Sequence, residues 1–281
     1  MSVIRTWKIF RYLGIAMINF CTIASGSSGN CTYIGLGKKH FLVDAGISGK
    51  RIEHALQSIK LHARDISGIF ITHEHYDHTT GAGVLARRFG IPIYATPETW
   101  RYFLRTGSIG KKINDDIIRY INPNETLFFE QAAITAFEIS HDACQPVGYT
   151  FEVNEEKAVI LTDLGEVTDS IKKHLKGAGI LMLESNHDPN MLKNGCYPEK
   201  LKARVASKLG HLSNAQAGTL LVEVAGSKLE YIVLAHLSEE NNTPLLAFET
   251  VKRILDINGV YIKQLSVAGR HKPGRLLQYG D

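Results

Sequence analysis

The sequence predicts an α/β fold in which β-sheets are covered by helices. Short apolar runs rich in β-branched residues alternate along the chain with segments whose apolar residues recur at helical spacing. Hydrophobic residues make up 44% of the 281 residues and charged residues 21%, a balance typical of globular proteins and too polar for a bundle of membrane helices. Layered α/β chains of this length often form one extended unit, so we expect a single domain and no membrane partner.

The strands and helices follow in order from these patterns. Alternation over 18–24 predicts the first strand, and the apolar spacing within 52–59 predicts a helix after a strand at 41–43. Further strands are expected at 66–72, 91–95, 134–139, 147–153, 158–162, 180–183, 231–235 and 261–267. The stretch 106–125 has the weakest periodicity and is expected to be a surface loop or insertion.

Several residues mark helix ends. Ser213 with Gln216 forms a capping box, and Thr243 before Pro244 supplies an N-cap followed by an N1 proline. Gly210 is expected to close the helix before it. On that helix, basic residues recur every four positions, at Lys200, Arg204 and Lys208. They are expected to form either a solvent-exposed helix face or a surface that binds a nucleic-acid backbone.

The N-terminus resembles a signal peptide only loosely. Basic residues within 1–11 precede an apolar run at 12–24, but cleavage after it would remove the first strand. We expect instead that Met17 is the physiological start, that 1–16 is an upstream extension and that 17–281 is the domain. The four cysteines lie far apart without a CxxC pair, which favours reduced thiols in the cytoplasm.

One segment combines four potential metal ligands within six positions. An apolar strand at 69–72 runs directly into His73, His75, Asp77 and His78. Side chains two apart in extended backbone point the same way, so His73 and His75 can share one ion, and the next turn can present Asp77 and His78 to a second. The alternative is a polar turn in which Asp77 caps a helix and the histidines face solvent.

Three more potential ligands occupy the same structural position, just past an apolar strand. They are His141, Asp163 and His236. Because α/β proteins place their sites at the carboxyl ends of strands, these residues are expected to join the first cluster. The seven residues suit two divalent ions: three imidazoles on one, two imidazoles and Asp77 on the other, and Asp163 bridging. Zinc fits best, although manganese or iron would also accept these ligands.

These motifs resemble those of the metallo-β-lactamase superfamily. Its hallmark HxHxDH matches residues 73–78, and its later motifs match His141, Asp163 and His236. The resemblance implies an αββα sandwich of two mixed β-sheets flanked by helices. Asp44, which matches the first motif, would support the ligand loop by hydrogen bonds without touching metal. Asp44 before Ala45-Gly46 is equally compatible with an ordinary turn.

A narrower likeness is to the YycJ/WalJ group of DNA exonucleases. It rests on the runs 24–30, 141–149, 184–188 and 210–214 and covers about 18–267. It implies a phosphodiesterase acting on DNA from the 5′ end, with substrate contacts at Ser27, Ser28, Asn30, Asn186, Ser213 and Asn214. The Gly/Ser loop at 25–30 can offer N–H and hydroxyl groups to a phosphate, but a tight hairpin would need the same residues.

The expected mechanism uses a hydroxide that bridges the two metals as the nucleophile. Asp77 serves as ligand and catalytic residue, and His211 is the candidate proton donor to the leaving alkoxide. Ribonuclease Z, a related phosphodiesterase, has a functional histidine in a comparable position, but its acidic companion is not evident in this sequence. A surface histidine between two helices is the plainer interpretation of His211.

Other functions remain open from sequence. A small-molecule hydrolase, acting on a cyclic phosphodiester, thioester or lactone, would use the same centre. A non-catalytic metal protein is disfavoured because all seven ligands are present, and a redox di-iron centre would place Glu where His75 stands. The net charge of +4 permits a polyanionic substrate without identifying one. The oligomeric state is not set by any pattern in the sequence.

Overall fold

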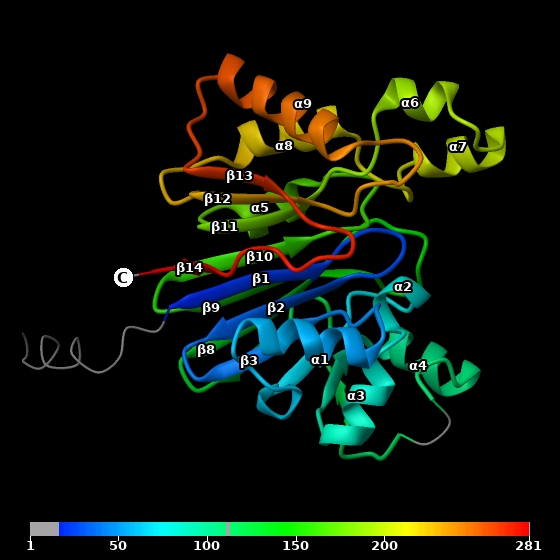
Figure 1. The fold of residues 1–281 in the computed structure, drawn as a ribbon, viewed down its shortest axis with the longest axis vertical. Coiled ribbons are helices and arrows are strands. Elements are labelled where there is room, and N and C mark those ends of the chain that lie inside the picture. Colours follow the sequence, from blue (N-terminus) through cyan, green and yellow to red (C-terminus); the bar gives the residue numbers. More distant parts are fainter. Residues whose placement is uncertain (1–16, 111–112, 281) are drawn as a thin grey trace, which may run out of the picture.

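In a computed structural model, which describes residues 17–110 and 113–280, two β-sheets lie face to face with helices on their outer sides (Figure 1). This arrangement confirms the predicted αββα sandwich. The extension expected over 1–16 lies outside the described residues, and the single domain over 17–281 stays a prediction. No described helix has the length and apolar character needed to cross a membrane.

The first sheet has seven strands in the order β14-β1-β2-β3-β4-β5-β6. The strands β14, β1, β2 and β3 pair antiparallel, and β3 to β6 run parallel. The strands are β1 (Ile18–Ala24), β2 (Cys31–Leu36), β3 (Lys39–Val43), β4 (Gly68–Phe70), β5 (Ile93–Ala95), β6 (Ile118–Tyr120) and β14 (Leu277–Tyr279).

The second sheet also has seven strands, in the order β13-β12-β11-β10-β9-β8-β7. The strands β10 to β13 run parallel, whereas β7 to β10 pair antiparallel. They are β7 (Thr126–Phe129), β8 (Ala132–Glu138), β9 (Val147–Val153), β10 (Glu156–Leu161), β11 (Ile180–Glu184), β12 (Tyr231–Ala235) and β13 (Gln264–Val267).

The helices occupy the crossovers between parallel strands and cover the outer faces. On the first sheet side are α1 (Gly49–Ser58), the 3₁₀ turn η2 (Ala63–Asp65), α2 (Tyr76–Thr79), α3 (Ala82–Phe89) and α4 (Pro97–Thr106). The second sheet carries α5 (Asp169–Leu175), α6 (Pro189–Asn194), α7 (Glu199–Val205), α8 (Asn214–Val224) and α9 (Pro244–Ile257). Each layer boundary is filled by its own cluster of buried apolar side chains.

An aromatic cluster fills the space between the sheets. Phe70, at the end of β4, makes ring contacts with side chains of both sheets, among them Tyr94 at 4.5 Å and Tyr149 at 5.4 Å between ring centroids. The Tyr149 hydroxyl donates a hydrogen bond of 2.7 Å to the carbonyl of Ile71. The strand that leads into the histidine-rich loop is therefore attached directly to the opposite sheet.

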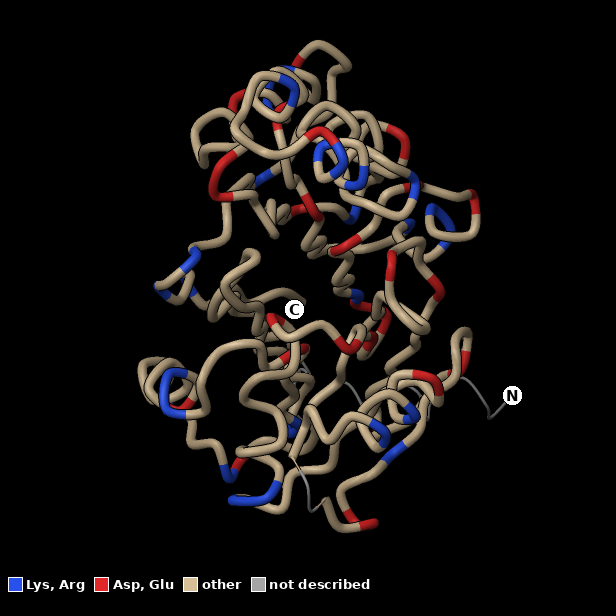
Figure 2. The backbone as a smooth tube through the Cα atoms, turned by 90° about the vertical axis from the view of Figure 1, so that its right-hand side faces the viewer, with Lys and Arg blue, Asp and Glu red and all other residues tan. Residues whose placement is uncertain are grey.

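Strand direction places several loops at one edge of the sandwich. In each sheet the parallel strands end at the same edge, and β8 points the same way as β10 because both are antiparallel to β9. The loops after β3, β4, β8, β10 and β12 consequently meet there. In Figure 2, which looks at the right-hand side of Figure 1, acidic segments lie in the middle of the molecule between its two halves.

Two local expectations were wrong. The stretch 106–125 contains β6, a three-residue edge strand whose partly exposed residues produce no clear alternation. The helix before His211 ends at Val205, so Lys208 lies in the following turn and Gly210 closes that turn rather than the helix. The basic stripe expected on this helix is also not free, since Arg204 pairs with Asp142 at 2.5 Å and Lys208 with Glu166 at 2.7 Å.

Removing the Tyr149 hydroxyl should loosen the contact between the sheets. We expect Tyr149→Phe to lower the free energy of unfolding by about 1 to 3 kcal/mol, because the buried Ile71 carbonyl loses its donor. Chemical denaturation followed by circular dichroism measures this loss. Tyr261→Phe, at a side chain that is 87% exposed, is the matched control and should change nothing. Equal stability of both variants would contradict a structural role for the hydrogen bond.

Candidate metal centre

The loop after β4 presents the first four site residues. Its backbone turns at His75, the N-cap of the one-turn helix α2, so Asp77 and His78 point back toward the end of the strand. His73 and His78 are fully buried. The Nε2 atom of His73 lies 3.0 Å from Nδ1 of His75, which places two imidazoles around one point as the spacing predicted.

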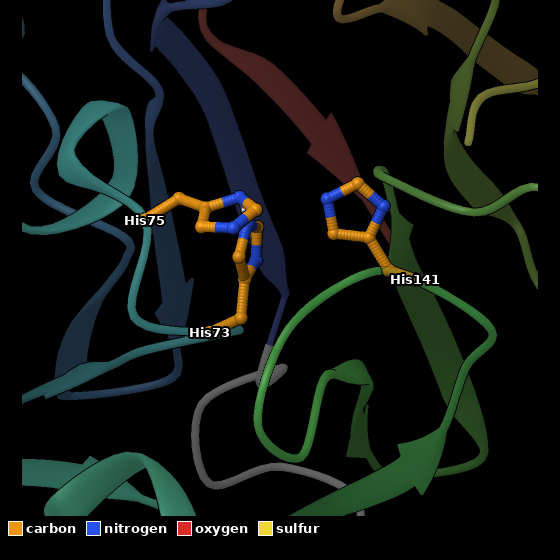
Figure 3. A group of neighbouring side chains, drawn as sticks. All are labelled: His73, His75 and His141. Atoms are coloured by element: carbon orange, nitrogen blue, oxygen red, sulfur yellow. Dashed lines mark hydrogen bonds between the residues drawn. The ribbon is translucent and has the colours of Figure 1, made fainter. Parts of the chain in front are cut away.

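The opposite sheet completes a group of three imidazoles. His141 follows β8, and its ring lies 5.0 Å from that of His73 and 5.2 Å from that of His75 between centroids. Figure 3 shows the three rings pointing toward one another from two separate parts of the fold. One nitrogen from each ring lies within 4.8 Å of the other two, a geometry that can hold a metal ion.

A second group lies beside the first. Asp77, His78 and His236 also offer ligand atoms that lie within 4.8 Å of one another. Asp163 stands between the groups: its Oδ2 lies 3.4 Å from His78 Nε2, and its Oδ1 lies 3.3 Å from His236 Nε2 and 3.9 Å from His141 Nε2. The structure thus brings together all seven predicted ligands. Their donor atoms form overlapping groups, two of which have the predicted membership.

Buried polar atoms at the centre fit bound cations. Oδ2 of Asp163 and Nε2 of His236 are both buried, and neither finds a hydrogen-bond partner among the described residues. Such atoms are costly inside a protein unless something compensates them. Burial and the neighbouring imidazoles hold the pKa of His73 well below its ordinary value, so this ring is neutral and can donate a lone pair. The donor set therefore suits divalent metal ions.

Asp44 supports the ligand loop from behind. Its Oδ2 lies 2.7 Å from Nδ1 of His78, and its carboxylate accepts hydrogen bonds from the backbone N–H and the hydroxyl of Thr72. Burial alone would lower the pKa of His78. The charges of Asp44, Asp77 and Asp163 nevertheless raise this pKa well above its ordinary value. These contacts match the role that the resemblance implied for Asp44.

Sequence reasoning missed Glu184 as a site residue. This carboxylate, fully buried at the end of β11, lies 2.8 Å from Nδ1 of His211 and 3.0 Å from Nδ1 of His236. It also accepts backbone N–H groups, including that of Asp163. Burial alone would raise the pKa of Glu184. The pKa is nevertheless lowered, because the charge of His211 and the hydrogen bonds with His211 and His236 outweigh burial. A polar residue closing an apolar strand was the available signal.

His211 lies inside the centre rather than on the surface. Its ring is 5.2 Å from the rings of both His141 and His236. Its Nδ1 lies 2.8 Å from Oε1 of Glu184, an acidic partner that was not evident from the sequence. Burial alone would lower the pKa of His211, but the charge of Glu184 and this hydrogen bond raise it. The interpretation of His211 as a surface histidine was therefore wrong.

Three site residues adopt left-handed backbone conformations at strand ends. The φ angles are 57° at Asp44, 60° at Asp163 and 54° at His236. Residues other than glycine seldom adopt this region, although Asp and His do so more readily than most. Such conformations persist where surrounding contacts impose them, and they turn each side chain from the strand edge into the centre.

The predicted substrate contacts divide into two sets. Ser27 and Ser28 are exposed on the β1–β2 loop. Asn30 is buried, and its Nδ2 lies 3.0 Å from His78 Nε2 and 3.2 Å from Asp77 Oδ2, so it faces the ligands.

The remaining three predicted contacts serve the protein itself. Asn186 donates to the carbonyl of His236, Ser213 caps α8, and Asn214 is fully buried against Ser185 and Asn242. Substrate contact by these residues stays a prediction, and Asn214 is fully occupied by its hydrogen bonds to Ser185 and Asn242.

Comparison with known families identifies the fold and the motifs. The family model described as "Metallo-beta-lactamase superfamily" matches residues 24–236, which include every residue of the centre. The chain belongs to the metallo-β-lactamase superfamily.

Within this superfamily it is 39% identical over 242 residues to exodeoxyribonuclease YycJ of Bacillus anthracis, covering 86% of this chain and 90% of the relative. It is equally identical over 232 residues to exodeoxyribonuclease WalJ of Streptococcus pneumoniae, covering 83% and 86%. The resemblance to the YycJ/WalJ group is thus confirmed.

Solved metallo-β-lactamase structures share the architecture at low sequence identity. The YhfI protein of Bacillus subtilis superposes with a TM-score of 0.68 and 18% identity over 94% of this chain and all of that one. The short form of human tRNase Z gives 0.61 and 19% over 92% and 99%. These similarities concern the fold alone.

Gly46 allows the ligand loop to approach β3. A Cβ atom at this position would lie 1.5 Å from the carbonyl oxygen of Asp77, which is backbone and cannot rotate away. We expect Gly46→Ala to displace the loop and to destabilise the protein by at least about 3 kcal/mol, at the upper end of overpacking effects. Thermal unfolding measures this, with Gly226→Ala as control because a Cβ there meets nothing within 4 Å. Similar midpoints for the two variants would show that the loop adjusts freely.

Proposed function

We propose that the protein is a metal-dependent phosphodiesterase, and more narrowly a DNA exonuclease that uses two divalent ions. One observation carries the proposal: two groups of three ligands lie side by side, share Asp163, and have a carboxylate-held histidine next to them. The printed names of the relatives, exodeoxyribonucleases YycJ and WalJ, support DNA as the substrate.

The residues of the centre would have different roles. His73, His75 and His141 would hold one ion, and Asp77, His78 and His236 the other, with Asp163 between. When bound, such a pair of cations lowers the pKa of water and polarises a phosphoryl oxygen. Glu184 and Asp44 would keep His236 and His78 in place, since carboxylates behind ligating imidazoles fix ring orientation. Zinc is our first choice for the metal, with manganese or iron as alternatives.

His211 would transfer a proton to the leaving oxygen. Because Nδ1 faces Glu184, the other ring nitrogen, Nε2, is free to serve a substrate. The side chain is 17% exposed, so it is reachable while its orientation is fixed. The same arrangement of carboxylate, imidazole and reacting group is a common design for general acids and bases.

We also propose that the enzyme works in the cytoplasm. Cys21, Cys31, Cys144 and Cys196 are all free thiols in the described structure, in keeping with a reducing compartment.

The first test concerns the centre itself. Wild type, His73→Ala and the control His62→Ala, at an exposed position, are loaded with zinc or manganese and given 5′-phosphorylated and 5′-hydroxyl DNA and RNA. We expect His73→Ala to bind less metal by elemental analysis and to lose cleavage by at least about 100-fold, whereas His62→Ala keeps both. Chelation of wild type should abolish activity, and returning the metal should restore it.

The outcomes separate the competing functions. Equal cleavage by wild type and His73→Ala would refute the proposed centre. Cleavage of nitrophenyl phosphodiesters without any cleavage of DNA would instead favour a small-molecule hydrolase.

The second test isolates the proton transfer. We expect His211→Ala to reduce kcat on DNA by about 100-fold to 10,000-fold. The same variant should be affected far less on thymidine 5′-(p-nitrophenyl phosphate), because nitrophenolate leaves without protonation. Glu184→Gln should lower kcat on both substrates, because Glu184 holds His236 as well as His211, and Glu230→Gln, on the surface, should change neither. An equal loss on both substrates would mean that His211 only positions the ligands.

A further inference from the structure

A groove is lined by residues of α1, of the segment that follows it, and of the loop that joins β13 to β14. Figure 1 shows where α1 and these two strands lie in the fold. It has a volume of about 730 Å³, and its floor is apolar, with Ile23, Ile47 and Leu276 among its residues. The rim on α1 carries Arg51 and His54, one helical turn apart on the same face. The groove is therefore amphipathic, with donors above an apolar base.

The opposite rim comes from the segment 271–276 and contributes His271 as its polar residue. Residues 270–275 read RHKPGR, but Arg270 bonds to the carbonyl of Leu237 and pairs with Glu239, and Arg275 lines other pockets. His271 from this segment lines the groove, and Lys60 at the end of α1 faces it. The two cations that line the groove, Arg51 and Lys60, therefore both come from the α1 side.

The charges of the groove have no acidic partners. None of the described residues that line it is acidic. No described carboxylate lies within 4.0 Å of the charged groups of Arg51 or Lys60, whereas the nearby acids are occupied: Glu53 pairs with Arg88, and Glu239 pairs with Arg270. Unpaired cations without interspersed carboxylates favour an anionic ligand.

The loop 25–30 connects the groove to the metal centre. On one side, the hydroxyl of Ser25 accepts from the N–H of His236 and Asn30 contacts His78. On the other side, Gly29 lies against Ile47 of the groove floor, and the N–H of Ser25 bonds to the carbonyl of Gly269. The loop, on which Ser27 and Ser28 are exposed, thus contacts both the groove floor and the metal centre.

We infer that this groove binds the phosphodiester backbone of a single DNA strand whose end lies in the metal centre. The inference rests on the proposed nuclease function. Phosphates would meet Arg51 and Lys60, the imidazoles of His54 and His271 would add N–H donors, and sugars or bases would lie on the apolar floor. Backbone contacts of this kind give affinity without sequence preference, which suits an exonuclease that must advance along any strand.

The test compares two double variants with the same change of charge. Arg51→Ala/Lys60→Ala removes both groove cations, and Lys252→Ala/Arg253→Ala removes two exposed cations of α9. Binding of a fluorescent 20-nucleotide single strand with phosphorothioate linkages, which are cut slowly, is followed by anisotropy in the metal-loaded proteins. We expect the groove variant alone to bind roughly 25-fold more weakly at 0.1 M salt and its log–log salt slope to fall by about 1.4, since each phosphate contact contributes about 0.7.

Two further measurements make the result specific. Arg51→Lys/Lys60→Arg keeps the charges and should retain the wild-type salt slope. Hydrolysis of bis(p-nitrophenyl) phosphate, which is too small to reach the groove, should be unchanged in the groove variant, whereas KM for a cleavable DNA strand should rise with little change in kcat.

The proposed DNA binding by the groove and the proposed nuclease function can be disproved independently of each other. If the groove variant and the α9 variant bind DNA equally well, the groove does not bind DNA, and this conclusion holds even if wild type cleaves DNA. If the groove variant loses binding but wild type cleaves no DNA, the binding site stands and the proposed nuclease function falls.

Discussion

The candidate centre depends on two β-sheets being held at a fixed separation. His73, His75, Asp77 and His78 come from the edge of one sheet, whereas His141, Asp163 and His236 come from the edge of the other. Neither set alone surrounds two ions. The distance between the sets is determined by the apolar layer between the sheets, where Phe70 and Tyr149 pack. Because protein interiors are close-packed and resist compression, this layer acts as a rigid spacer.

Buried carboxylates complete this construction. Asp44 lies behind His78, and Glu184 lies behind His236 and His211. Each also accepts backbone N–H groups, so the charge is stabilised while the imidazole is oriented. Their polar contacts reach across strand ends that are distant in sequence. The result is a centre in which His78, His236 and His211 are each held by a buried carboxylate, which favours a preorganised geometry.

Much of the fold and of the centre could be predicted from sequence because both follow local rules. The strands that end in His73, His141, Asp163 and His236 are apolar runs closed by a ligand, and the order of these runs fixes the layers. The strands β2, β6, β7 and β14 were missed. The strand β2 is buried along its whole length and so shows no alternation, whereas β6, β7 and β14 have only three or four residues and include exposed positions. Glu184 carried little signal because its role depends on His211, 27 positions away. The buried hydrogen bonding of Asn214 likewise depends on Asn242, which no spacing rule connects to it.

The left-handed backbone at Asp44, Asp163 and His236 limits how this scaffold can change. Valine, isoleucine or threonine at these positions would bring a branched side chain into conflict with its own carbonyl, whatever chemistry was wanted there. Glycine, asparagine and aspartate tolerate the conformation best. Attempts to redesign the centre by random libraries would therefore recover few alternatives at these three positions, and variation would accumulate in the surrounding loops, where the main chain is less constrained.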